Sequence, residues 1–127
     1  GDFDTRAEER LKDIGQWMDL HNRSIYNCTQ APDDFLKPDN CYLTYNPITK
    51  RIYVHVLEWP IRSLRLKGFK GKISYAQLLN DGSEIKFKEY IKPGSHTTEV
   101  LQDNDVLLEL PVQKPGVDIP VIEIFLK

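Results

Sequence analysis

The sequence predicts a mainly β protein: an antiparallel β-sandwich of about eight strands preceded by one amphipathic α-helix. Up to residue 21, apolar residues recur at helical spacing, whereas after residue 40 they alternate with a period near two. Turn-forming residues separate the alternating segments, as is typical of short antiparallel strands that follow one another. We therefore expect two units, a helix with a linker in residues 1–40 and a β-sandwich domain in residues 41–127.

The helix is expected from residue 5 to about residue 21. Thr5 and Glu8 fit a capping box, which marks the start of a helix. The polar, turn-rich residues 22–40 are expected to form an irregular linker. Helical spacing places one group of apolar side chains on a single face, which we call the helix stripe: Ala7, Leu11, Ile14, Trp17 and Met18.

The strands are predicted from alternation and from the turns between them. The turn signal in residues 46–50 should join the first two strands as a hairpin, and Asp81-Gly82 should join the fourth and fifth. Asp103-Asn104-Asp105 is expected to form a turn, and residues 111–120 a longer loop. The segments predicted as strands are 41–45, 51–58, 64–67, 72–79, 84–90, 97–101, 106–110 and 121–126.

Four segments carry a family resemblance: residues 10–18 (RLKDIGQWM), 24–26 (SIY), 52–60 (IYVHVLEWP) and 73–82 (ISYAQLLNDG). In them the chain resembles the C-terminal part of the α-L-fucosidases of glycoside hydrolase family 29. The resemblance covers most of the chain from residue 3 to about residue 91. It implies that the first two segments are the last helix of a catalytic (β/α)₈ barrel and its exit. The other two would be strands of the β-sandwich appended to that barrel.

The resemblance implies a domain without catalytic residues. A (β/α)₈ barrel needs roughly 250 residues, more than the 127 of this chain. A retaining glycosidase needs two carboxyl groups roughly 5 Å apart, and the family's nucleophile is an aspartate of the barrel. No segment matches that site, so the chain is not expected to be an enzyme by itself, and no cofactor is expected. Glu58, Glu109 and Glu123 are candidate carboxylates, but the favoured interpretation is that each faces solvent.

The expected partner is the catalytic barrel of the same parent chain, with a fucosylated glycan as the parent's substrate. By resemblance, the parent is periplasmic, secreted or lysosomal. Self-association through the helix is a further expectation. With 17 Lys and Arg against 19 Asp and Glu, interspersed along the chain, the composition argues against nucleic acid and anionic membranes as partners. No apolar segment approaches the roughly 20 residues of a membrane-spanning helix.

The segment 51–58 is apolar on both faces, which favours a place at the centre of a sheet. Ile52, Val54 and Val56 should face the sandwich core. The opposite face should be covered by the helix, the linker or the barrel, and it should carry Tyr53, His55, Leu57 and Trp59. The residues expected at the interface with the barrel are Leu11, Ile14, Trp17, Met18, Tyr53, Leu57 and Trp59.

Residue types also suggest features other than a packing domain. A sugar-binding module remains the second interpretation, because six aromatic residues of the β region are available as platforms: Tyr42, Tyr45, Tyr53, Trp59, Tyr75 and Tyr90. A metal site is disfavoured, because His21, His55 and His96 lack ligand spacing. Ser95, His96 and Asp103 offer no more than a chance catalytic trio. Cys28 and Cys41 are expected to be free thiols, although a bridge between them stays open.

Overall fold

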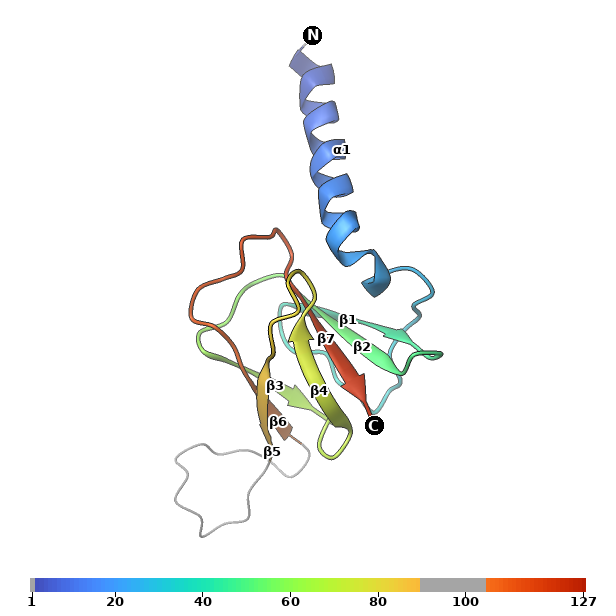
Figure 1. Ribbon diagram of the computed structural model, residues 1–127, viewed down its shortest axis with the longest axis vertical. Helices are drawn as coiled ribbons and strands as arrows, with labels where there is room; N and C mark the ends of the chain where they lie inside the picture. Colours follow the sequence, from blue (N-terminus) through green and yellow to red (C-terminus); the bar gives the residue numbers. More distant parts are fainter. Residues whose placement is uncertain (1, 90–104) are drawn as a thin grey trace.

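A long helix, α1 (Asp2–His21), stands on one end of a two-layer β-sandwich (Figure 1). The computed structural model describes residues 2–89 and 105–127. A short 3-10 helix, η1 (Asn22–Ser24), follows α1 directly. The strands are β1 (Cys41–Asn46), β2 (Arg51–Val56), β3 (Ser63–Lys67), β4 (Ile73–Leu78), β5 (Lys86–Glu89), β6 (Asp105–Glu109) and β7 (Val121–Leu126). The mainly β architecture with one preceding helix is confirmed.

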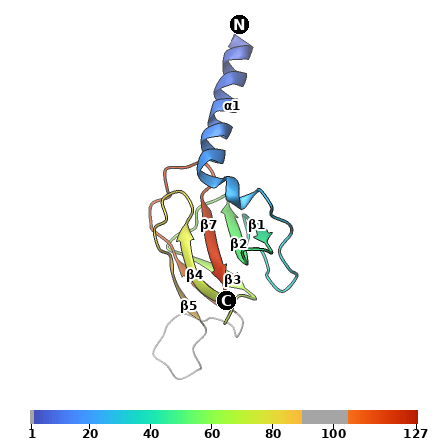
Figure 2. The same ribbon diagram turned by 45° about the vertical axis from the view of Figure 1, so that its right-hand side comes forward.

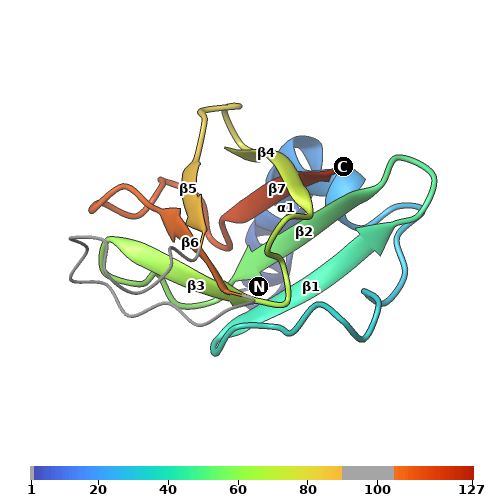
Figure 3. The ribbon, with the colours of Figure 1, turned by 90° about the horizontal axis from the view of Figure 1, so that it is seen from below.

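The strands form two antiparallel sheets, with the orders β1-β2-β7-β4 and β3-β6-β5 (Figure 3). The predicted hairpin at residues 46–50 is confirmed, because β1 pairs with β2 from Cys41↔Val56 to Asn46↔Arg51. The side chain of Asn46 stabilises this turn by accepting the backbone N–H of Ile48 at 3.0 Å. Strand β2 also pairs with β7, so its predicted place inside a sheet is confirmed.

The prediction that the fourth and fifth strands pair as a hairpin is wrong. The chain does turn at Asp81 and Gly82, where Gly82 has a φ of 74°. However, β4 pairs with β7, and β5 pairs with β6 in the other sheet. A single bridge between Gln77 and Glu84 joins the two segments. The reason is that Ile85 enters the core between the sheets, which carries the chain from one layer to the other.

Two predicted boundaries also differ from the structure. Helix α1 already begins at Asp2, so Thr5 lies inside the helix and does not cap it. No Gly or Pro stands between these positions to stop the helix from extending. Asp105 was expected in a turn but begins β6, where it is buried and lies 3.6 Å from the Arg65 guanidinium. The predicted strand 97–101, together with Tyr90, Ser95, His96 and Asp103, lies outside the described residues.

The main hydrophobic core fills the space between the two sheets. As predicted, Ile52, Val54 and Val56 belong to it, and Cys41 joins them from β1. Cys28 instead packs on the opposite face of the four-stranded sheet, so the two cysteines are separated and both are free thiols. Burial of Cys41 raises the pKa of its thiol to about 11.

The linker between η1 and β1 runs along the sandwich. Thr29 and Tyr45 exchange two backbone hydrogen bonds, of 2.7 and 2.9 Å. Further on, the linker passes close to Gly68, where a Cβ atom would stand 1.9 Å from the carbonyl oxygen of Asp34. Gly68 therefore allows this close passage, and its φ of 88° is also a conformation that glycine adopts readily.

Candidate functional site

The last turns of α1 meet the four-stranded sheet at one end of the sandwich, on the outer face of that sheet (Figure 2). Trp17 is the helix residue that packs there, against a second apolar cluster of Tyr53, Leu79 and Val121. Its indole N–H also donates a hydrogen bond of 3.0 Å to the carbonyl of Ile119. One aromatic residue thus contacts the sheet and the β6–β7 loop at once.

His21 lies beside Trp17 and is fully buried, at 0% exposure. The two rings are stacked, with centroids 4.7 Å apart and an interplanar angle of 18°. Nδ1 of His21 lies 2.9 Å from the carbonyl oxygen of Trp17, a geometry in which the imidazole N–H donates. Nε2 is then the basic nitrogen, and it has no hydrogen-bond partner among the described residues. Burial lowers the pKa of His21, which favours this neutral form.

His55 projects toward the same place from β2, with its ring centroid 6.4 Å from that of Trp17. The Thr44 hydroxyl donates to the carbonyl of Ser24, and its oxygen lies 2.9 Å from Nε2 of His55. Because the hydroxyl proton is already engaged, the imidazole is the donor of the second bond. Burial, reinforced by the nearby His21, lowers the pKa of His55 to about 4.

Glu123, in the middle of β7, is the charged centre of the same face. It is fully buried, so the expectation that it faces solvent is wrong. Gln77 donates to Oε1 at 2.7 Å, while the Arg23 and Arg51 guanidinium groups lie 3.2 and 3.4 Å from Oε2. Burial and the adjacent Glu123 raise the pKa of Tyr53 to about 12. The sequence could place Glu123 on this face, but its two arginine partners come from distant segments without any motif.

The three candidate carboxylates do not form a glycosidase pair. Glu58 is exposed in the loop after β2. Glu109 points outward from the three-stranded sheet, because Leu108 before it faces the core, and it forms an ion pair with Lys88 at 3.0 Å. Glu123 lies on the outer face of the opposite sheet. Glu109 and Glu123 thus stand on opposite sides of the sandwich, whereas the chemistry requires roughly 5 Å between carboxyl groups.

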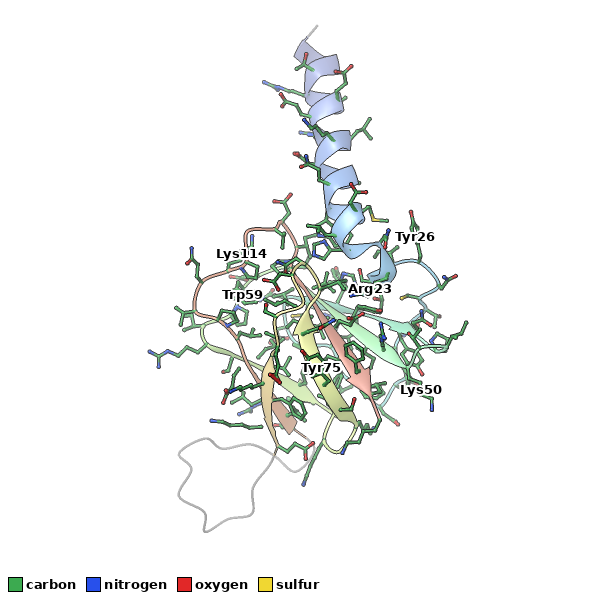
Figure 4. The ribbon with its side chains drawn as sticks, viewed as in Figure 1. Arg23, Tyr26, Lys50, Trp59, Tyr75 and Lys114 are labelled. Atoms are coloured by element: carbon green, nitrogen blue, oxygen red, sulfur yellow. The ribbon has the colours of Figure 1, made fainter. Side chains whose placement is uncertain are left out.

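The middle of the helix stripe is open in the single chain. Leu11 is 68% exposed and Ile14 is 59% exposed, whereas Trp17 and Met18 are half-buried. Figure 4 shows the upper part of α1 rising clear of the sandwich, with its side chains projecting to the sides of the helix. We expected the stripe to be covered by the sheet or by another chain. Within this chain, the sheet covers the Trp17 end and leaves Leu11 and Ile14 uncovered.

The remaining interface residues divide between the two faces of the sheet. Tyr53 is buried on the outer face, as predicted, and Leu57 is half-exposed beyond the strand end. Trp59 does not share their face, because it packs on the main core and donates a 3.0 Å hydrogen bond to the carbonyl of Pro111. Strand β2 ends at Val56, so the alternation used to orient Trp59 no longer applies there.

The described part of the chain has neither a metal-binding cluster nor a membrane-spanning helix. Among residues 2–89 and 105–127, no three His, Cys, Asp or Glu side chains are grouped so that they could hold a metal ion. No helix in this part is both long and apolar enough to cross a bilayer.

The sequence and fold are similar to those of known proteins. No family model matches the sequence. The human plasma α-L-fucosidase is 26% identical over 106 residues, and that of Pongo abelii is 29% identical over the same length. Each match covers 82% of this chain but 21% of the relative, so the chain spans about a fifth of the curated relatives it matches.

Solved structures agree with these relatives. Isoenzyme 1 of the α-L-fucosidase from Paenibacillus thiaminolyticus superposes with a TM-score of 0.73 at 27% identity, over 92% of this chain and 26% of the enzyme. An α-L-fucosidase of family GH29 from Bacteroides thetaiotaomicron gives 0.69 at 27% identity, over 90% of this chain and 23% of the enzyme. The helix and sandwich are therefore similar in fold to one part of known glycoside hydrolases. More particularly, the chain resembles the C-terminal region of α-L-fucosidases of glycoside hydrolase family 29.

Proposed function

We propose that this chain is the non-catalytic C-terminal β-sandwich domain, with the preceding barrel helix, of an α-L-fucosidase-like glycoside hydrolase. Its function is to pack against the catalytic (β/α)₈ barrel and stabilise it, and residues 41–127 form the domain proper. The fucosylated glycan is then a substrate of the whole enzyme. The observation that carries this proposal is the helix stripe, which is apolar and regular and in which Leu11 and Ile14 are left exposed by the chain's own sandwich.

The energetics of the stripe support a partner. Burial of a leucine or isoleucine side chain is worth about 1.5–3 kcal/mol, so leaving Leu11 and Ile14 in water forgoes a considerable stabilisation. Trp17 and Met18 extend the same stripe down to the sheet, so one partner can cover both the helix and its junction. The last helix of a (β/α)₈ barrel has such a requirement, because its inner stripe packs on the barrel strands.

Sugar binding is the function that the aromatic residues would otherwise suggest. Both tryptophans are half-buried, and each donates its indole N–H to a backbone carbonyl. Tyr53 is fully enclosed. Tyr42 is exposed on the edge strand β1, where the Lys37 ammonium lies 5.6 Å from its ring centroid. These aromatic side chains do not form a common open platform, and no observation favours the sugar-binding function over packing.

The test compares a double charge substitution in the helix stripe with a control substitution elsewhere, both made in the enzyme that contains the barrel. Leu11→Glu combined with Ile14→Glu should lower its melting temperature by about 5 °C or more, because both charges would enter the barrel interface. The matched control is Ile48→Glu in the β1–β2 turn, where the side chain is 86% exposed, and it should leave melting unchanged. In the isolated chain, neither the double substitution nor the control should change the melting temperature. Equal melting of all three enzymes, or a parent protein without a barrel, would refute the proposal.

A further inference from the structure

The junction between α1 and the sheet contains three aromatic rings, two of which are ionisable imidazoles. Trp17 and His21 come from the last turns of the helix, and His55 comes from β2 beneath them. Both imidazoles are buried, and neither forms an ion pair among the described residues. A proton added to either ring would therefore create a charge with no counterion, in a place that excludes water.

We propose that Trp17, His21 and His55 form an acid-sensitive latch: when the imidazoles gain protons, the end of α1 leaves the sheet while the sandwich stays folded. This inference concerns the chain itself and does not depend on the proposed function. The two imidazoles must become solvated to carry charge, and the element that can move to let this happen is the helix end. His55 is fixed within a paired strand, whereas α1 projects away from the sandwich (Figure 2).

The sandwich can remain folded because its core is separate from the latch. The core between the sheets contains no residue of α1. The helix contributes Trp17 to the second cluster, on the outer face of the four-stranded sheet. Releasing the helix end therefore exposes Tyr53, Leu79 and Val121 but removes nothing from the main core. Local opening at a free energy below that of global unfolding is the expected behaviour of such an element.

Other titratable groups around the latch do not supply a counterion. Arg23 and Arg51 already engage Glu123, and their positive charges oppose any additional proton. Burial raises the pKa values of the Tyr53 phenol and the Cys28 thiol, so both are neutral near pH 7. Asp13 of α1 and Asp118 of the β6–β7 loop line the open groove beside Trp17, and Asp19 is exposed on the last turns of α1.

The chain offers a matched pair of reporters for this opening. The indole N–H of Trp17 and that of Trp59 each donate a 3.0 Å hydrogen bond to a carbonyl of the residues that lead from β6 to β7, at Ile119 and Pro111. Trp17 belongs to the latch, whereas Trp59 packs on the sandwich core. The two ¹H–¹⁵N indole resonances, assigned with Trp17→Phe, therefore report helix release and sandwich unfolding separately.

The experiment follows both resonances of the full chain from pH 7.5 to pH 4. We expect the Trp17 indole to lose its hydrogen-bonded position as the pH falls below 6.5, with its solvent exchange relative to Trp59 rising about tenfold per pH unit at first. The Trp59 resonance should stay in place. The variant His21→Phe with His55→Gln keeps a stacked ring and a donor for Thr44 but cannot titrate, so its Trp17 should remain bound at pH 4.

Three results would overturn the latch. Trp17 and Trp59 shifting together would indicate general acid unfolding. If the Trp17 indole keeps its hydrogen bond at pH 4 in the unmodified chain, protonation of the imidazoles does not release the helix end. Retention of the transition in the double variant would assign it to other groups. If the double variant does not fold, His55→Gln alone is used, and an unchanged midpoint of the Trp17 transition would likewise refute the proposal.

Discussion

Arg23, on the turn that leaves α1, places its Nε 3.2 Å from Oε2 of Glu123 in the middle of β7. The carboxylate is fully buried, while the arginine side chain remains half-exposed. This ion pair fixes the start of the linker over the sheet and, with it, the point from which the helix rises (Figure 4). The partially exposed Arg51 guanidinium and the side-chain amide of Gln77 lie against the same carboxylate.

Glu123→Ala should destabilise the sandwich by about 3 kcal/mol, because it leaves the Arg51 and Gln77 donors without their acceptor in a covered site. The matched control is Glu109→Ala. It removes another strand glutamate with a cationic partner, but the Lys88 pair is exposed and its loss should cost less than about 1 kcal/mol. Urea unfolding of both variants measures the difference. Similar losses of unfolding free energy in the two variants would show that the buried Glu123 ion pairs stabilise the fold no more than the exposed Glu109 pair.

Trp59→Ala should lower the free energy of unfolding by about 3 kcal/mol, because the ring packs on the main core and its N–H holds the Pro111 carbonyl. A sugar-binding role predicts the opposite pattern, with weakened glycan affinity and nearly unchanged melting. Thermal unfolding and titration with a fucosylated glycan, done on this one variant, separate these two outcomes.

Stability should fall as the pH drops from about 6.5 to about 4. The pKa of His55 is lowered from 6.5 to about 4 in the folded chain, so the unfolded chain binds more protons in this window. The contribution of neutral His55 is fully present above pH 6.5 and is lost on acidification, by up to about 3 kcal/mol. The check is the difference in urea midpoint between pH 7 and pH 4.5. It should shrink in His55→Gln, and an equal difference in both proteins would contradict the assignment.

Deletion of residues 1–22 should leave the sandwich folded but less stable. The main core contains no residue of this segment, whereas the second cluster loses Trp17 as its cover. Light scattering before and after the deletion also tests the earlier expectation of self-association through the helix. Unchanged melting together with an unchanged monomeric mass would show that the helix contributes nothing to the isolated chain.

The sequence predicted the parts of the fold that depend on local periodicity. The two-sided apolar pattern of residues 52–56 placed β2 inside a sheet, since alternation directly reflects which side chains are covered. Sequence reasoning failed where the pairing of strands depends on residues that are far apart in the chain. Asp81-Gly82 does form a turn, but the burial of Ile85 between the sheets sends β5 to the other layer.

The site was less accessible to sequence reasoning for the same reason. Alternation located the covered face of Tyr53, but not the ion pairs that make burial of Glu123 possible, because these join residues from η1, β2 and β7. Nor could it show that His21 and His55 lie beside the same Trp17 ring, since this arrangement depends on the direction in which α1 leaves the sheet. Spacing along the chain carries no information about such encounters.

The most direct test of the packing role is amide hydrogen exchange of α1, measured in the isolated chain and in the barrel-containing enzyme. In the isolated chain, the amides of residues 7–16 should exchange rapidly, because Leu11 and Ile14 are exposed there and little tertiary packing supports this part of the helix. In the enzyme, the account predicts that the same amides are protected by about a hundredfold more, as the barrel covers the helix stripe. Equal exchange of these amides in the two proteins would contradict it.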